Sequence, residues 1–203
     1  RAEDEVLELL DMLGLGHLRE NFRASMVDDA ASLARLEDVV LECLGIEEAW
    51  ARAASEGKGA SAFEVGLESY LGEGTPCNFR NARVATVEGR TAGMAVGYFL
   101  PKDTDFTGPF DPVFEPVMSL FKKAVGSWLL DALAVYSAFR GKGIARALLD
   151  DQIAAGGNND MHIVCADDNQ AAMALYRSRG FGPVERAPFI QTETPRDTKE
   201  WLL

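Results

Sequence analysis

The fold of this chain is decided by residues 136–152, which read YSAFRGKGIARALLDDQ. This stretch follows an apolar run, WLLDALAV at 128–135, and leads into an amphipathic pattern that predicts a helix over 144–155. Unpaired backbone N–H groups and the positive end of the helix dipole meet at a helix N-terminus, so a glycine-rich, cationic turn placed there suits a phosphate or pyrophosphate. The turn consists of Arg140, Gly141, Lys142 and Gly143.

The two familiar nucleotide-binding motifs do not occur in this turn. Lys142 is followed by Gly143 rather than by a hydroxyl residue, and Arg146 stands where the third glycine of G-x-G-x-x-G would be. The pattern that fits is R-x-x-G-x-A, formed by Arg140, Gly143 and Ala145. Taken alone, this pattern is also compatible with an ordinary strand-to-helix turn whose cations are solvated.

A second motif lies on the next helix predicted along the chain. Residues 169–181 read NQAAMALYRSRGF and fit the pattern N-x-x-A-x-x-L-Y-x-x-x-G-F. In this order, with a strand between them, the two motifs resemble those of the GCN5-related N-acetyltransferase (GNAT) family. The resemblance covers 128–181, and the hairpin predicted at 83–100 is similar to the second and third strands of that family. Ser137 and Phe139 depart from the proline and tyrosine that the family often carries.

The resemblance implies a mixed α/β (α+β) fold with a mostly antiparallel sheet, whose fourth and fifth strands splay apart, flanked by helices. Residues 20–203 would form this acyltransferase domain, with the family's first strand and helix at 21–40. Residues 1–19 have no counterpart in the family. They are predicted to form an N-terminal helical extension, packed on the domain or on the partner in a homodimer.

The resemblance also assigns roles around acetyl-CoA, the implied co-substrate. Tyr176 would be the general acid that protonates the departing thiolate, although a core aromatic on an amphipathic helix is the alternative. Asn169 would hydrogen-bond the pantetheine arm. Main-chain groups of three strand residues would pair with the pantetheine, and amides of the turn would hold the pyrophosphate. The strand residues are Leu133, Ala134 and Val135, and the turn amides belong to Gly141, Lys142, Gly143, Ile144 and Ala145.

A carboxylate interrupts the apolar strand before the turn. Burying the charge of Asp131 there costs free energy unless the carboxylate has a hydrogen-bonding or charged partner, or a catalytic role. Desolvation also raises the pKa of a carboxyl group. Strand alternation predicts that it shares a face with Leu133 and Val135. It is the candidate general base for the amine, with a charge satisfied by a neighbouring strand as the alternative. His162 is expected to be an ordinary strand histidine, and Cys165 a buried small hydrophobic residue rather than an acyl-enzyme nucleophile.

The segment 101–116 holds four of the eight prolines and is predicted to be a loop over the acceptor side. Its acidic residues outnumber its one lysine, which favours a cationic amine, and its phenylalanines offer an apolar wall. A solvated surface loop is the alternative. The residues concerned are Asp103, Asp105, Asp111 and Glu115, with Phe106, Phe110 and Phe114.

Composition narrows the classes of partner. The net charge of -12 argues against nucleic acid and against an anionic membrane surface. Three widely spaced cysteines indicate a reducing compartment, and the two histidines lack metal-ligand spacing, so no metal site is expected. With no apolar run of transmembrane length and an acidic start, we expect a soluble, cytoplasmic protein.

These patterns together predict an N-acetyltransferase that passes the acetyl group of acetyl-CoA directly to a primary amine of a small molecule or peptide. Two alternatives remain. Residues 5–46 loosely resemble a sterile alpha motif, a helical protein-interaction module. The same acetyltransferase-like fold could also serve as an acyl-CoA sensor without catalysis.

Overall fold

The computed structural model describes residues 55–57, 65, 76–108, 112–190 and 200–203. The predicted N-terminal extension at 1–19, the first strand and helix at 21–40 and the alternative interaction module at 5–46 lie outside these residues. The helices and strands that build the described fold fall between residues 79 and 202.

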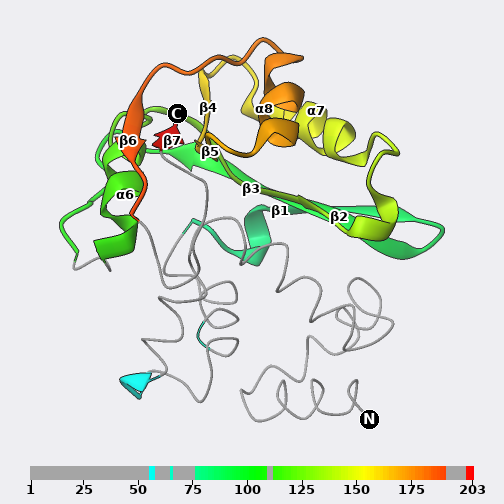
Figure 1. The fold of residues 1–203 in the computed structure, drawn as a ribbon, viewed down its shortest axis with the longest axis horizontal. Helices are drawn as coiled ribbons and strands as arrows, with labels where there is room; N and C mark the ends of the chain where they lie inside the picture. Colours follow the sequence, from blue (N-terminus) through cyan, green and yellow to red (C-terminus); the bar gives the residue numbers. More distant parts are fainter. Residues whose placement is uncertain (1–54, 58–64, 66–75, 109–111, 191–199) are drawn as a thin grey trace.

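A four-stranded sheet in the order β1-β2-β3-β4 forms the centre of the fold (Figure 1). The first three strands are antiparallel neighbours, and β4 runs parallel to β3. The connection between β3 and β4 is helix α7, so the predicted hairpin and the predicted strand–helix–strand unit are both confirmed. A mixed α/β fold with a mostly antiparallel sheet is what the sequence predicted. The elements are β1 (Ala82–Val87), β2 (Arg90–Leu100), β3 (Ser127–Val135), α7 (Ile144–Gly156) and β4 (Met161–Ile163).

A smaller sheet, in the order β5-β7-β6, follows the first. The strand expected between the two motifs is divided in two, because the chain leaves β3 after Ile163 and joins the smaller sheet at Cys165. Strand β7 also pairs antiparallel with β6, which completes this sheet. These elements are β5 (Cys165–Ala166), α8 (Gln170–Arg177), β6 (Arg186–Pro188) and β7 (Glu200–Leu202).

Part of the predicted loop at 101–116 is helical. Turn η3 (Pro112–Phe114) leads into helix α6 (Glu115–Phe121), which has a proline in its first turn. Proline is well tolerated there because its missing N–H would have had no partner within the helix. Two further turns, η2 (Phe79–Asn81) and η4 (Ser137–Phe139), precede β1 and α7.

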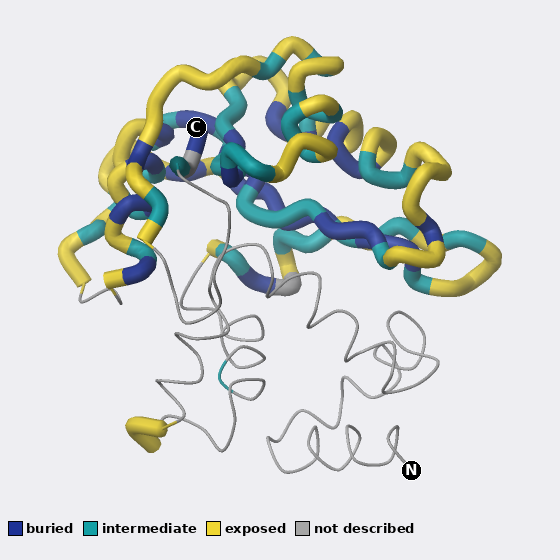
Figure 2. Tube along the Cα trace, in the orientation of Figure 1, coloured by how far each residue is buried: buried dark blue, intermediate teal, exposed yellow. Residues whose placement is uncertain are grey.

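Apolar side chains form one cluster on each face of the main sheet, and Figure 2 shows the buried centre of the strands. Helices α7 and α8 cover one face (Figure 1). We call the cluster beneath them the helix-side cluster; its buried members are Ala92, Ala95, Leu130, Val135, Phe139, Leu148, Leu149 and Ile163. The opposite-face cluster has as its buried members Val96, Tyr98, Leu100, Val117, Leu120, Ala124, Leu129, Ala166, Ala187 and Leu203.

Helix α7 is fixed to the sheet by a buried polar contact. The Oε1 atom of Gln152, a residue that is 1% exposed, accepts a hydrogen bond of 3.1 Å from Nε1 of Trp128. The amide lies directly over Gly97 of β2, where a side chain would leave no room for it. A buried polar group is stable only when its hydrogen bonds are made, so this contact sets where α7 crosses β2 and β3.

Candidate active site

Strand β3 is paired on both sides for only part of its length. Trp128, Leu129 and Leu130 pair with β4, whereas the residues that follow pair only with β2 among the described strands. This is the splay that the family resemblance implied, and no other described strand pairs with β3 along Leu133–Val135, an arrangement that suits an extended ligand there. One main-chain group there is already engaged, because the carbonyl of Val135 accepts a 3.2 Å hydrogen bond from Nε of Arg140.

The turn after β3 presents backbone amides without a side-chain cap. Gly141 and Gly143 have φ angles of 75° and 81°, the left-handed region that glycine adopts without strain. Gly143 is the N-cap of α7 and makes no capping bond, and the first helical bond runs from Ala147 N–H to its carbonyl, at 3.0 Å. The amides of residues 144–146 therefore have no acceptor within the helix and suit an anion.

Three cations from two elements gather at this turn. The Nζ atom of Lys142 lies 5.2 Å from the ring centroid of Phe139, and the guanidinium carbon of Arg90 lies 5.6 Å from the same centroid. Arg140 joins them from the turn itself. Arg90 was missed by the sequence reasoning, although antiparallel pairing of β2 with β3 brings the start of one strand beside the end of the other. In this part of the chain the charge is locally positive despite the acidic total.

Asn169 begins helix α8 as its N-cap. Its side-chain oxygen accepts a 3.1 Å hydrogen bond from the N–H of Ala172, so part of its amide group has a structural role. The NH₂ group of the same side chain can still donate to a ligand, as the family resemblance implies.

Two substitutions separate these roles of Asn169. Asn169→Asp keeps an equally good capping oxygen but removes the NH₂ donor, so we expect unchanged thermal stability and weaker acetyl-CoA binding. Asn169→Ala also removes the cap and should cost roughly 1 kcal/mol of stability. Thermal unfolding and calorimetric titration of both variants measure the two effects, and equal acetyl-CoA affinity in wild type and Asn169→Asp would contradict the ligand role.

Tyr176 lies on the helix side of the sheet. It packs against the helix-side cluster and meets the ring of Phe181 edge-on, with centroids 6.3 Å apart. Leu133 and Val135, from the half-paired segment of β3, belong to the same cluster. The phenol is thus placed on the face that also carries the uncapped end of α7. A second phenol in this cluster, Tyr136, has its pKa raised to about 12 by burial and therefore stays protonated.

Asp131 occupies a β-bulge, and this corrects one prediction. Leu130 pairs with Gly97 and Ala132 with Val96, so Asp131 has no residue opposite it in β2. The expectation that it shares a face with Leu133 and Val135 was wrong. It accepts hydrogen bonds from Cys77 and Tyr98, and both of those residues belong to the opposite-face cluster.

The bulge explains the change of face. One extra residue in a strand shifts the alternation of side chains, so Asp131 and Ala132 both project toward the opposite-face cluster before the strand resumes its period. Burial raises the pKa of the Asp131 carboxyl, and the hydrogen bonds from Cys77 and Tyr98 oppose this rise only in part. A carboxylate with a raised pKa is a stronger base than one in water.

His162 and Cys165 have structural partners. The Ser127 hydroxyl donates to the carbonyl of Ala124, so it can only accept from Nδ1–H of His162, at 2.8 Å. The Cys165 thiol donates to the Ala166 carbonyl at 3.4 Å. Within the described ranges, no three His, Cys, Asp or Glu side chains gather where a metal ion could bind. The helices of those ranges are also too short or too polar to cross a membrane.

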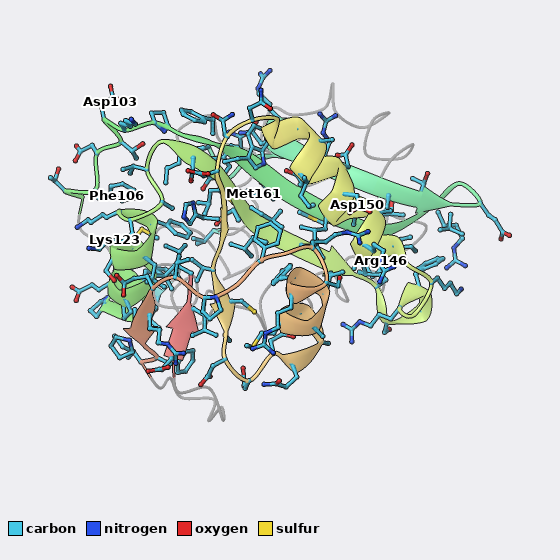
Figure 3. All side chains as sticks on the ribbon, turned by 90° about the horizontal axis from the view of Figure 1, so that it is seen from above. Asp103, Phe106, Lys123, Arg146, Asp150 and Met161 are labelled. Atoms are coloured by element: carbon cyan, nitrogen blue, oxygen red, sulfur yellow. The ribbon has the colours of Figure 1, made fainter. Side chains whose placement is uncertain are left out.

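The described part of the loop at 101–116 contributes to the opposite face. Phe106 packs against the opposite-face cluster, with Nζ of Lys122 6.0 Å from its ring centroid. Asp105 folds back on Thr107, whose hydrogen bonds lower the pKa of its carboxyl. Figure 3 shows Asp103, Phe106 and Lys123 at the opposite end of the molecule from Arg146 of α7. Asp111 and Phe110 lie outside the described residues.

Three of the known proteins that are similar to this chain illustrate the range of similarity. An uncharacterized protein of Mycobacterium leprae (strain TN) is 30% identical over 102 residues, which are 50% of this chain and 24% of that protein. The chain therefore spans about a quarter of the curated relative that it matches. A ribosomal-protein-alanine N-acetyltransferase from Brucella melitensis is 28% identical, with a TM-score of 0.41, covering 60% of this chain and 64% of that one. An N-acetyltransferase from Staphylococcus aureus Mu50 is 13% identical, with a TM-score of 0.47, covering 78% and 92%.

A match to a protein-family model establishes the family of this chain. The model of the "Acetyltransferase (GNAT) family" matches residues 44–181, about two thirds of the chain. The match includes the turn at the start of α7 and the motif on α8. The chain belongs to the GNAT acetyltransferase family.

Proposed function

We propose that this chain is an N-acetyltransferase that transfers the acetyl group of acetyl-CoA directly to a primary amine. The observation that carries the proposal is the uncapped, glycine-based N-terminus of α7 at the end of a half-paired strand. The helix N-terminus suits a pyrophosphate, and the strand edge directly before it suits an extended arm that carries amides. Acetyl-CoA has both parts, and this chain belongs to an acetyltransferase family.

The residues available to bind acetyl-CoA lie in β3, in the turn between β3 and α7, and at the start of α8. Amides of the turn, from Gly141 to Ala145, take the pyrophosphate, and Lys142 and Arg140 add positive charge. The open edge of β3 along Leu133–Val135 hydrogen-bonds the pantetheine arm, as an added strand would. Asn169 donates to the same arm from the start of α8.

The chemistry is a direct acyl transfer assisted by two side chains. The amine nitrogen forms a bond to the thioester carbonyl carbon while Asp131 takes up a proton from the nitrogen, and the C–S bond then breaks. Tyr176 donates a proton to the departing thiolate. The two side chains lie on opposite faces of β3, so proton uptake and proton donation are separated across the strand.

This arrangement places the acceptor amine on the face of the opposite-face cluster. Asp131 projects there, and the loop residue Phe106 packs against the same cluster. A half-buried carboxylate and an acidic loop favour an acceptor that arrives as a cation, loses one proton to solvent, and gives up the second to Asp131 during attack. We propose a small-molecule or peptide amine of this kind as the acceptor.

Reversing the charge of Arg140 tests the pyrophosphate site. In a titration calorimeter, we expect wild type to bind acetyl-CoA and Arg140→Glu to bind it roughly tenfold to a hundredfold more weakly, the effect of losing a hydrogen bond between charged groups. Wild-type affinity should also fall as salt is added. Lys123→Glu is the matched control, because it makes the same change of charge at an exposed site just after α6.

Each outcome of this comparison has a distinct meaning. Equal losses in both variants would indicate a general charge effect and count against a site at the turn. A folded wild type that does not bind acetyl-CoA would overturn the proposal. Binding without transfer to any amine of a broad panel would favour the acyl-CoA sensor instead.

A further inference from the structure

We propose that Cys77 and Tyr98 are positioning residues that orient the Asp131 carboxylate toward the acceptor amine. Nothing in the family motifs assigns a role to either residue. The inference rests on the proposed function, in which Asp131 is the base, and it names the groups that make this carboxylate usable as one.

The three residues come from separate elements and meet on one face. Cys77 precedes η2, Tyr98 lies in β2, and Asp131 is the bulged residue of β3. Tyr98 pairs with Leu129, and both belong to the opposite-face cluster toward which Asp131 projects. Tyr98 is 8% exposed and its ring is therefore held by packing, which gives its hydroxyl a defined position.

The Asp131 carboxylate has hydrogen-bond acceptor positions beyond those that Cys77 and Tyr98 use. A thiol and a phenol can each donate a single hydrogen, and Cys77 and Tyr98 both hydrogen-bond to Asp131. An ionised carboxylate accepts at about four lone-pair positions, so two donors fix its plane and leave positions for the nitrogen of an amine. A bulged residue has no cross-strand partner to hold its side chain, and these two donors supply that restraint.

The same donors favour the ionised form of Asp131, from which a general base starts. Burial favours the neutral acid, whereas hydrogen bonds to the carboxylate favour its ionised form, and a general base must begin unprotonated. His162 of β4 shares this face but its Nδ1 is engaged by Ser127. The charged residues of α7 lie over the other face, and Arg90 lies at the far end of β2 beside Phe139. Among the described residues, Cys77 and Tyr98 are thus the titratable groups that contact Asp131.

The test compares pH profiles of conservative variants. Tyr98→Phe and Cys77→Ala each remove one donor with little change in shape, so the pKa of Asp131 should rise and the acid limb of kcat/KM should move to higher pH. At a pH on that limb we expect a loss of about tenfold, which corresponds to roughly 1.4 kcal/mol of lost hydrogen bonding. Cys77→Ser retains a donor and should restore a profile close to wild type, which a purely steric role for Cys77 would not predict.

A second measurement does not depend on activity. Titration of the Asp131 carboxyl carbon by NMR, in protein labelled at its aspartates and identified with Asp131→Asn, should show a higher pKa in Tyr98→Phe and in Cys77→Ala than in wild type or Cys77→Ser.

The outcomes separate this inference from the proposed function. If wild type transfers acetyl groups but neither the acid limb nor the carboxyl titration moves in Tyr98→Phe and Cys77→Ala, the positioning role is overturned and the acetyltransferase proposal stands. If wild type transfers no acetyl group to any amine, the proposed function is overturned and the catalytic role of the two donors falls with it.

Discussion

Asp131→Asn is expected to lower kcat by about a hundredfold to ten-thousandfold, the range that general-base assistance supplies. Asparagine has nearly the same shape and keeps an oxygen that can accept from Cys77 and Tyr98, but it cannot take up a proton. Binding of acetyl-CoA should be unchanged, because the turn and the edge of β3 that we propose as its site do not involve this side chain. Steady-state kinetics together with calorimetric titration measures both quantities.

The same substitution should stabilise the fold at neutral pH. Burial raises the pKa of Asp131 in the folded state above its unfolded value, so the folded state binds more protons between these two values. Stability is therefore greatest below the unfolded pKa and falls as pH rises through the folded pKa. Above it, the folded protein carries a desolvated charge that asparagine lacks, and the melting temperature of Asp131→Asn should exceed that of wild type.

Either part of this prediction can fail separately. A variant that keeps full kcat would show that another group is the base. A variant that is inactive and also less stable than wild type at neutral pH would show that the carboxylate holds the fold together, which is the alternative interpretation of a charge in this strand.

Gly97→Ala is expected to produce the largest loss of stability. A Cβ atom at this position would overlap Oε1 of Gln152 and would lie 2.8 Å from Nε1 of Trp128, which is closer than a carbon atom tolerates. Because Gln152 is buried and bonded to Trp128, it cannot move without breaking that contact. Overpacking of this kind costs about 1–3 kcal/mol, and the lost hydrogen bond adds roughly 1 kcal/mol.

Chemical denaturation of Gly97→Ala measures this loss directly. Gly182→Ala is the matched control, because it makes the same substitution at an exposed glycine with no neighbouring atom within 4 Å and no left-handed φ. In a domain of this size, each kcal/mol lowers the melting temperature by about 2–4 °C. Two variants with equal stability would mean that α7 does not approach β2 as closely as the structure shows.

Local sequence patterns were enough to predict the family, the main elements of the described fold and the glycine turn that we propose as the anion site. The hairpin, the strand–helix–strand unit and the uncapped start of α7 depend on residues that are close in sequence, through alternation, helical spacing and turn glycines. Such preferences act over a few residues, so a single sequence displays them. For the same reason, the two family motifs could be found without the structure.

Pairing between distant segments decided the rest. The face of Asp131 depends on a bulge, and a bulge is defined only by the partner strand, in which Val96 and Gly97 oppose its neighbours. The approach of Arg90 to Phe139 and the hydrogen bonds from Cys77 and Tyr98 to Asp131 also join residues far apart in the chain. Burial, which raises the pKa of Asp131, is a property of the packed fold, and no local stretch of sequence contains it.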